Sequence, residues 1–138
     1  MPGKILIAAA NYWTSPYQVG SHHYARVFAE NGWKVMFVSD PISPLHFLAA
    51  EKKQVNERYD IYKERVSSGN KNIDIYVPMS LFTPNEKSFF RSDFVINSWH
   101  RFTIPDAVKH IASAGFGEVD VLWFDSIIQY FWINAIKH

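Results

Sequence analysis

The chain alternates short apolar runs with longer segments in which apolar residues recur at helical spacing. Mostly apolar runs of strand length occupy residues 4–10, 33–40, 73–77 and 119–124. Strands that are apolar on both faces are typical of parallel sheets covered by helices on either side. The pattern therefore predicts four parallel strands.

The segment between the first two runs has the pattern of an amphipathic helix. Tyr24, Val27 and Phe28 recur at spacing i, i+3, i+4, which predicts a helix over residues 21–31. Ser21 is a suitable N-cap for this helix, because its hydroxyl can accept from a free backbone N–H. Strand, helix and strand then form a βαβ unit, whose crossover is expected to be right-handed.

The later segments add further helices. Residues 44–68 carry many charges and fit one or two solvated amphipathic helices. Helices are also expected over residues 86–99 and 103–114, and from residue 127 onward. The order of elements predicts the α/β class, as a three-layer α/β/α Rossmann-like domain with an open parallel sheet.

Composition narrows the class of protein. With 138 residues, 48% of them apolar and 20% charged, the chain is expected to form one globular domain. The net charge of +1 gives no electrostatic reason to expect a nucleic-acid partner. The absence of cysteine excludes disulfides and Cys-based metal sites. No apolar stretch in the sequence approaches the length of a membrane-spanning helix.

Open parallel sheets bind their ligands beyond the carboxyl ends of the strands. That rule directs attention to residues 10–23, 39–44, 78–82 and 125–129. No G-x-G-x-x-G, G-x-x-x-x-G-K-[ST] or G-x-S-x-G motif occurs in the sequence. Dinucleotide-dependent oxidoreductases, P-loop NTPases and α/β-hydrolases are therefore not favoured.

The first of these segments combines a glycine, a serine and two histidines. Gly20 allows a phosphate or a sugar to approach the backbone closely, and Ser21 either caps the helix or also meets such a ligand. In a first helical turn the side chains of His22 and His23 point about 100° apart, so the pair does not suit one metal ion. One histidine of the pair is expected to face the cleft.

Two aspartates end predicted strands. Asp40 ends the second strand, where an acidic residue carries little meaning without a glycine-rich motif. Asp125 ends the fourth strand, ahead of Ser126. Asp125 is either a hydroxyl-binding carboxylate or general base, or the N-cap of the helix that follows.

One pattern spans the first two predicted strands and the helix between them. It reads Lys4-Ile-Leu-Ile, a loop with Ser, Pro and Gly, and then Ser21-His22-x-x-Ala25-Arg26-x-x-Ala29-x-x-Gly32-x-x-Val35-x-x-Val38-Ser39. Later stretches read Ile75-Tyr-Val-Pro-x-x-Leu81-x-x-Pro84 and Val119-Asp-Val-Leu-Trp-Phe-Asp-Ser126. Together they resemble the N-terminal Rossmann-like domain of GT-B glycosyltransferases. The nearest group is the retaining, family 4-like enzymes of bacterial polysaccharide assembly, which use nucleotide sugars.

The resemblance implies that residues 1–138 are the acceptor-side half of a GT-B fold, ending before a C-terminal donor-binding domain. It implies transfer of a hexosyl group from a UDP- or GDP-linked donor to a polysaccharide or glycolipid acceptor. No metal and no other cofactor is expected. The isolated chain is expected not to transfer sugar, because most donor contacts would lie in the second domain.

The resemblance also implies a set of site residues, although it assigns no catalytic one. The residues expected at the donor and acceptor cleft are Gly20, Ser21, His22, Asp125 and Ser126. The aromatic residues expected to stack on sugar, or else to cover the sheet edge or pack on the second domain, are Tyr12, Trp13 and Tyr17.

The partners implied are a nucleotide sugar, a carbohydrate or lipid-linked acceptor and the C-terminal domain of the same protein. The expected location is the cytoplasm, with peripheral contact at the inner face of the membrane. An alternative from the residues alone is a stand-alone Rossmann-like module that binds an anion or a partner without catalysis. A nucleotide-binding enzyme of flavodoxin-like fold ranks last, because phosphate-loop chemistry is sparse in the sequence.

Overall fold

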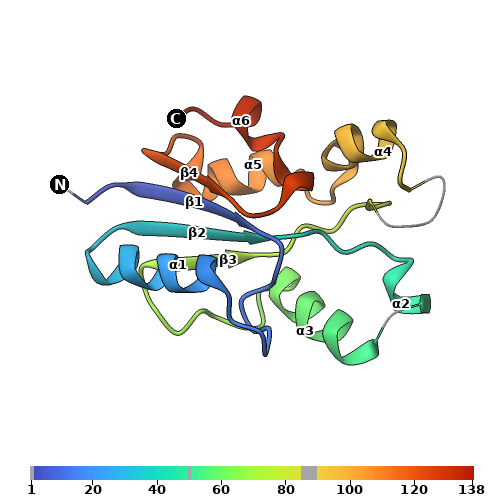
Figure 1. The fold of residues 1–138 in the computed structure, drawn as a ribbon, viewed down its shortest axis with the longest axis horizontal. Helices are drawn as coiled ribbons and strands as arrows, with labels where there is room; N and C mark the ends of the chain where they lie inside the picture. Colours follow the sequence, from blue (N-terminus) through green and yellow to red (C-terminus); the bar gives the residue numbers. More distant parts are fainter. Residues whose placement is uncertain (1, 50, 85–89) are drawn as a thin grey trace.

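The computed structural model describes residues 2–49, 51–84 and 90–138, which place a parallel sheet between two layers of helices (Figure 1). Its strands are β1 (Lys4–Ala9), β2 (Lys34–Ser39), β3 (Ile73–Tyr76) and β4 (Val121–Phe124). They lie in the order β3-β2-β1-β4, and every neighbouring pair is parallel. The predicted open parallel sheet is confirmed.

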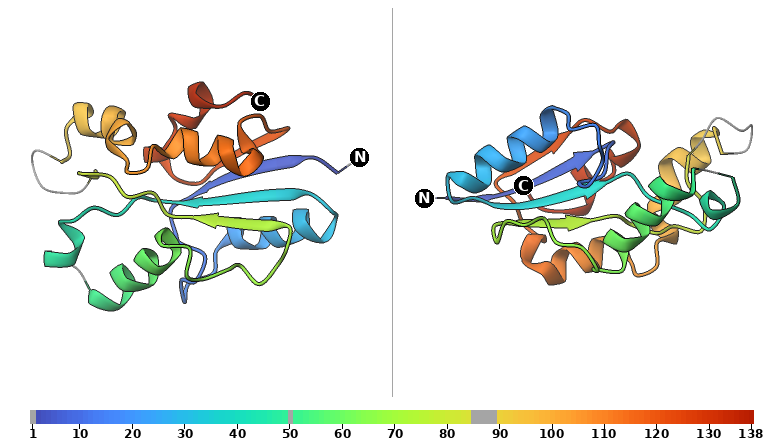
Figure 2. Two further views of the ribbon diagram at one scale, coloured as in Figure 1. Left: turned by 180° about the vertical axis from the view of Figure 1, so that it is seen from behind. Right: turned by 90° about the horizontal axis from the view of Figure 1, so that it is seen from below.

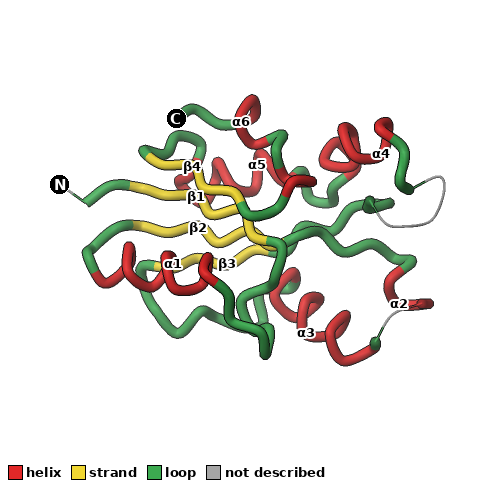
Figure 3. Tube along the Cα trace, in the orientation of Figure 1, coloured by secondary structure: helices red, strands yellow, loops and turns green. Residues whose placement is uncertain are grey.

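Helical segments connect these strands (Figure 3). The α-helices are α1 (Gly20–Glu30), α2 (His46–Ala49), α3 (Lys52–Tyr62), α4 (Asp93–Ser98), α5 (Ala107–Ile111) and α6 (Trp132–Ala135). Two short segments are 3-10 helices, η1 (Trp99–Phe102) and η3 (Ile127–Gln129), and one is a π-helical turn, η2 (Ala112–Phe116). No helix among the described residues is long and apolar enough to cross a membrane.

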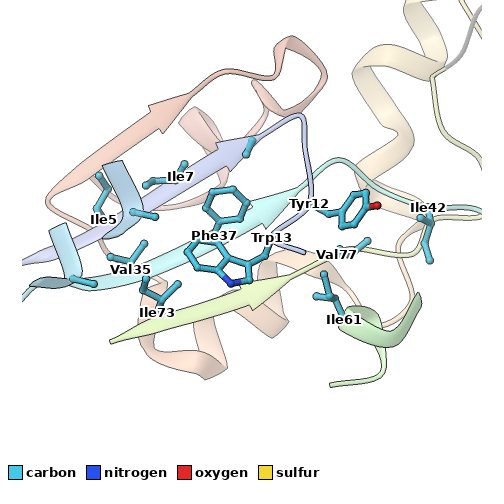
Figure 4. Close-up of a cluster of buried hydrophobic side chains, with 13 residues drawn as sticks. Ile5, Ile7, Tyr12, Trp13, Val35, Phe37, Ile42, Ile61, Ile73 and Val77 are labelled. Carbon is cyan, nitrogen blue, oxygen red and sulfur yellow. The ribbon is translucent and has the colours of Figure 1, made fainter. Parts of the chain in front are cut away.

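Both faces of the sheet are buried, because successive side chains of a strand point to opposite sides. Ile5 and Phe37 lie on the face covered by α1 and α3, in the cluster that Figure 4 shows. Leu6 and Met36 lie on the other face, against α5 and α6. The second view in Figure 2 separates α1 from α5 on opposite sides of the sheet. The predicted three-layer α/β/α arrangement is therefore confirmed.

The βαβ unit at the start of the chain follows the sequence pattern closely. Helix α1 ends just before Gly32, whose φ of 83° lies in the left-handed region that favours glycine. The next residues enter β2, which pairs with β1 in parallel from Lys4 opposite Lys34 to Ala9 opposite Ser39. The helix thus returns the chain to the amino end of the sheet in the shortest way.

Several predicted boundaries differ from those observed. The prediction that Ser21 caps α1 is wrong, because the helix begins at Gly20 and the cap position is Val19. The predicted helix over residues 86–99 begins in a segment, 85–89, that lies outside the described residues, and α4 begins only at Asp93.

The helix predicted from residue 127 onward is broken in two. A 3-10 turn, η3, is followed by the short helix α6. The side chain of Gln129, at the end of η3, is hydrogen-bonded to the sheet. We attribute the break to this residue, because binding to the strand ends fixes the direction in which the chain continues.

Candidate functional site

The carboxyl ends of β1 and β4 meet at a point where the chain departs in opposite directions. From β1 the chain crosses one face of the sheet through α1, whereas it reaches β4 from the other face through α5. In open α/β sheets this arrangement leaves a crevice between the two strand ends. A ligand site is therefore expected between the loop after β1 and the residues after β4 (Figure 1).

Asp125 joins the two sides of this point. The backbone N–H of Ala10 donates to Asp125 Oδ1 at 2.6 Å, and the Asp125 N–H donates to the carbonyl of Ala8 at 3.0 Å. The aspartate is exposed, and its Oδ2 has no hydrogen-bond partner among the described residues. The carboxylate binds the β1 exit and not a helix N–H, so Asp125 does not cap η3. One of its oxygens is open to a ligand.

Ser126 turns inward at the same point. Its side chain is buried, and its Oγ donates to Asp40 Oδ1 at the end of β2, 86 positions earlier in the sequence. The predicted cleft residue Ser126 therefore supports the strand ends and does not itself face the open edge.

Gln129 completes this buried connection. The amide nitrogen Nε2 donates to the carbonyls of Ala9 and Val38 at 3.0 and 3.2 Å, and to Asp40 Oδ1 at 3.0 Å. Its Oε1 accepts from Trp132 Nε1 at 3.2 Å. The side chain is fully buried, so one amide group ties the ends of β1 and β2 to the segment after β4.

Two ionisable groups lie beneath the end of β2. Burial raises the pKa of the Asp40 carboxyl, against the hydrogen bonds from Ser126 and Gln129 that lower it. Arg58 of α3 donates from Nη2 to the carbonyls of Asp40 and Pro41, at 2.5 and 2.8 Å. Burial lowers the pKa of this guanidinium. The arginine therefore holds a positive charge against the backbone that follows β2.

Sequence reasoning missed Gln129 and Arg58 and gave Asp40 little weight. The signals were present but weak. Gln129 is a single amide within a strongly apolar stretch, and Arg58 shares a helix face with the buried Val55 and Ile61 at i±3 spacing. Neither pattern indicates which groups the side chain binds. Those groups lie at the ends of β1 and β2 for Gln129, and just after β2 for Arg58.

The aromatic residues of the first loop differ in exposure. Tyr12 and Trp13 are buried, and in Figure 4 they lie among the apolar side chains over β2. Tyr12 donates from its hydroxyl to Glu57 Oε2 at 2.6 Å, and Trp13 Nε1 donates to the carbonyl of Ser68 at 3.3 Å. Tyr17 is 74% exposed. Of these three residues only Tyr17 presents its ring to a ligand.

His22 is fully buried, whereas His23 is exposed. The ring of His22 packs against Trp13 and Phe37, with centroid distances of 5.5 and 4.8 Å. Its Nε2 lies 3.0 Å from the carbonyl of Tyr12, and the N–H of Val19 donates to Nδ1. A carbonyl only accepts, so the proton resides on Nε2. Both nitrogens of His22 are thus used inside the domain, and His22 is not presented to the cleft.

The start of α1 offers free donors. The N–H groups of Gly20 and Ser21 have no hydrogen-bond acceptor among the described residues, as expected for the first turn of a helix. The Ser21 hydroxyl is buried and likewise lacks a partner within the described chain. A Cβ added to Gly20 would approach Tyr24 no closer than 3.7 Å, so the fold itself does not require glycine there. The two N–H groups suit an anion, whereas the Ser21 hydroxyl has no surface exposed to one.

Burial lowers the pKa of three histidines, His22, His46 and His100. The unfolded chain then binds protons that the folded domain does not, so stability is full above about pH 6.5 and is lost as the pH falls below it. The raised pKa of Asp40 acts in the opposite direction, its contribution being lost as the pH rises through that pKa. We expect the melting temperature to decrease as the pH is lowered from about 7.5 to about 5.

Thermal unfolding followed by circular dichroism across this pH range is the measurement. An Asp40→Asn variant removes the opposing carboxyl and should keep the fall. A melting temperature that stays constant from neutral to acidic pH would contradict the assignment of neutral buried histidines.

The chemistry available at this edge is hydroxyl and anion binding. Asp125 supplies an exposed carboxylate, and the start of α1 supplies N–H donors. The rings of Tyr24 in α1 and Trp123 in β4 pack together with a centroid distance of 4.8 Å, so the first turns of α1 lie beside the strand end that carries Asp125. The described residues contain no group of three side chains arranged to hold a metal ion.

Comparison with known proteins gives one match. A family profile, described as the N-terminal domain of the glucuronosyltransferase GumK, matches residues 7–138, which is nearly the whole chain. No curated protein and no solved structure matches the chain significantly.

Proposed function

Because the chain belongs to the family of GumK glucuronosyltransferase N-terminal domains, and is thereby a Rossmann-like half of a GT-B glycosyltransferase, we propose that its protein transfers a sugar from a nucleotide donor to a glycan or glycolipid acceptor. The protein takes a glucuronosyl or related hexosyl group from a UDP- or GDP-linked donor. It passes this group to a hydroxyl of a polysaccharide or glycolipid acceptor. The binding site for the donor is completed by a C-terminal domain of the same protein. The transfer needs no metal ion.

The observation that carries this proposal is that Asp125 and the start of α1 both lie at the carboxyl edge of the sheet, where Tyr24 of α1 packs on Trp123 of β4. The N–H groups of Gly20 and Ser21 are donors at the positive end of a helix, which suits the diphosphate of a sugar nucleotide. The open oxygen of Asp125 suits an acceptor hydroxyl. In any such transfer the acceptor oxygen bonds to the anomeric carbon as the diphosphate leaves it, so the groups that bind each must lie close to that carbon.

In this proposal, the chain's own residues position and do not themselves react. Asp125 orients the acceptor hydroxyl, while its Oδ1 is held by the N–H of Ala10. Helix α1 stabilises negative charge on the departing diphosphate. His22 and the buried amide of Gln129 fix the two segments that carry these groups.

Two finer statements stay predictions. The residue pattern resembles retaining enzymes of bacterial polysaccharide assembly, and the anomeric configuration of the product, read by NMR, tests retention. A cytoplasmic location with peripheral membrane contact is tested by fractionating cells that produce the protein.

The proposal is tested by turnover of the protein that carries this domain. We expect release of the nucleoside diphosphate from UDP-glucuronate, UDP-glucose or GDP-mannose, stimulated by acceptor glycolipid from the producing cell. A correctly folded protein that turns over none of these donors, with that acceptor present, would sink the proposal.

The Asp125→Asn variant tests the site itself. The amide oxygen of asparagine still accepts from Ala10, so the fold should survive, but a charged acceptor for the hydroxyl is lost. We expect kcat/KM to fall about 10- to 100-fold, the value of a hydrogen bond to a charged group. Asp120→Asn is the matched control, because Asp120 accepts from the N–H of Lys4 at the opposite end of the sheet. Equal activity of the two variants would remove Asp125 from the site.

A further inference from the structure

A cavity of about 490 Å³ lies beside the strand edge just described, and no part of the proposed transfer uses it. It opens between the segment of α4 and η1 on one side and the segment of η3 and α6 on the other. Figure 1 shows both segments beyond or beside the carboxyl ends of the strands. A volume of this size accommodates one or two sugar rings.

The polar groups around this cavity are free to bind. Asn97 donates from Nδ2 to the carbonyl of Asp93, which leaves its Oδ1 as an acceptor. The side chains of Arg101, Tyr130 and Asn134 have no hydrogen-bond or ion-pair partner among the described residues. Amide and hydroxyl groups that both donate and accept are what a ring of sugar hydroxyls requires.

Two aromatic rings contribute to the wall of the cavity. The ring of His100 stacks on Phe131 with a centroid distance of 4.1 Å and an interplanar angle of 3°. The His100 Nδ1 is buried and has no partner within the described chain. Ile128 and Val108 add apolar surface nearby. Aromatic and aliphatic side chains beside amides suit the C–H surface of a sugar ring, while the amides meet its hydroxyl edge.

The charge of the cavity favours an anionic sugar. Arg101 is exposed at its rim, and the described residues that line the cavity include no aspartate or glutamate. A ligand carboxylate would therefore meet the positive charge of Arg101 at the cavity wall, while Asp106, the acidic group that acts on His100, stands outside the lining. Arginine presents a donor fork that matches a carboxylate.

We propose that this cavity binds a sugar residue of the acceptor, preferentially one that carries a carboxylate directed at Arg101. The Asn97 and Asn134 amides take the ring hydroxyls, and the stacked His100 and Phe131 rings form the wall. This inference rests on the proposed function, because a glycan acceptor is expected of a sugar-transferring protein. The cavity would select the glycan, whereas Asp125 would orient the reacting hydroxyl.

The experiment is NMR titration of the protein with D-glucuronate and with the methyl glycosides of glucose, mannose and galactose, each to about 20 mM. The side-chain amide signals of Asn97 and Asn134 and the ring signals of His100 should shift, with a dissociation constant of about 1–10 mM for the best ligand. Glucuronate should bind about threefold more tightly than methyl glucoside at low salt, and this preference should vanish at high salt.

Asn134→Asp places a carboxylate opposite the sugar and should weaken binding of glucuronate about fivefold or more. Asn56→Asp is its matched control, since Asn56 is exposed on α3 and away from the cavity. Shifts at other residues only, no shift with any of the four sugars, or equal binding by both variants would overturn the inference. Sugar binding at these residues without donor turnover would instead overturn the proposed function and leave the cavity as a sugar-binding site that serves no transfer.

Discussion

Replacing Gln129 with leucine should reduce the free energy of unfolding by about 3–5 kcal/mol, a fall of about 10–17 °C in melting temperature. The leucine fits the volume but has no polar atoms. It would leave the acceptors at Ala9, Val38 and Asp40 without this donor, and Trp132 Nε1 without its acceptor, all within buried surroundings. A buried polar group that loses its partner costs about 1–3 kcal/mol, and added apolar burial offsets only part of that.

Gln54→Leu is the matched control for this variant. Gln54 is exposed on α3 and its amide binds only the neighbouring Glu51 side chain. The same chemical change there should alter stability by less than about 0.5 kcal/mol. Urea unfolding of both variants provides the comparison, and equal midpoints would show that the buried amide contributes nothing.

His22→Ala should cost about 3–4 kcal/mol of stability. The substitution removes a fully buried ring that packs on Trp13 and Phe37, which leaves a cavity. It also removes the partners of the Tyr12 carbonyl and the Val19 N–H. Because the latter contact anchors the start of α1, the first loop should also become more mobile.

His23→Ala, one position further along, serves as the control. His23 is exposed, so its removal should change the unfolding free energy by less than about 0.5 kcal/mol. Amide hydrogen exchange measures the loop directly, with faster exchange at the start of α1 expected in His22→Ala alone. Identical exchange in the two variants would mean that the buried histidine does not hold this loop.

The local pattern of apolar and polar residues predicted most of the fold. Four apolar runs predicted the four strands, and an amphipathic segment followed by Gly32 predicted the helix of the first βαβ unit. Such features depend on residues within one turn or one strand of each other, where sequence and structure are directly related. The predicted start of a helix was wrong where a side chain binds the backbone. At the start of α1, the N–H of Val19 donates to the His22 ring.

The site was less readable, because its contacts join distant parts of the chain. Sequence placed Asp125 at an open strand end, and the structure leaves it exposed there. It could not show that Ser126 turns inward to Asp40, nor that Tyr12 and Trp13 pack beneath the loop. Aromatic and polar residues in a loop look alike in sequence whether they meet a ligand or the core, since only tertiary packing distinguishes the two.

The position of β4 has a consequence for biosynthesis. Strand β4 pairs with β1, placing Ile5 beside Val121, so β1 lacks this neighbour until β4 has left the ribosome. Closing so long a loop is entropically costly and slows folding. Until β4 and the residues after it arrive, one edge of β1 is unpaired and the apolar cluster around Leu6 and Ala8 is incomplete, a state open to aggregation. A nascent chain released before residue 121 should therefore depend on chaperones far more than the finished domain does.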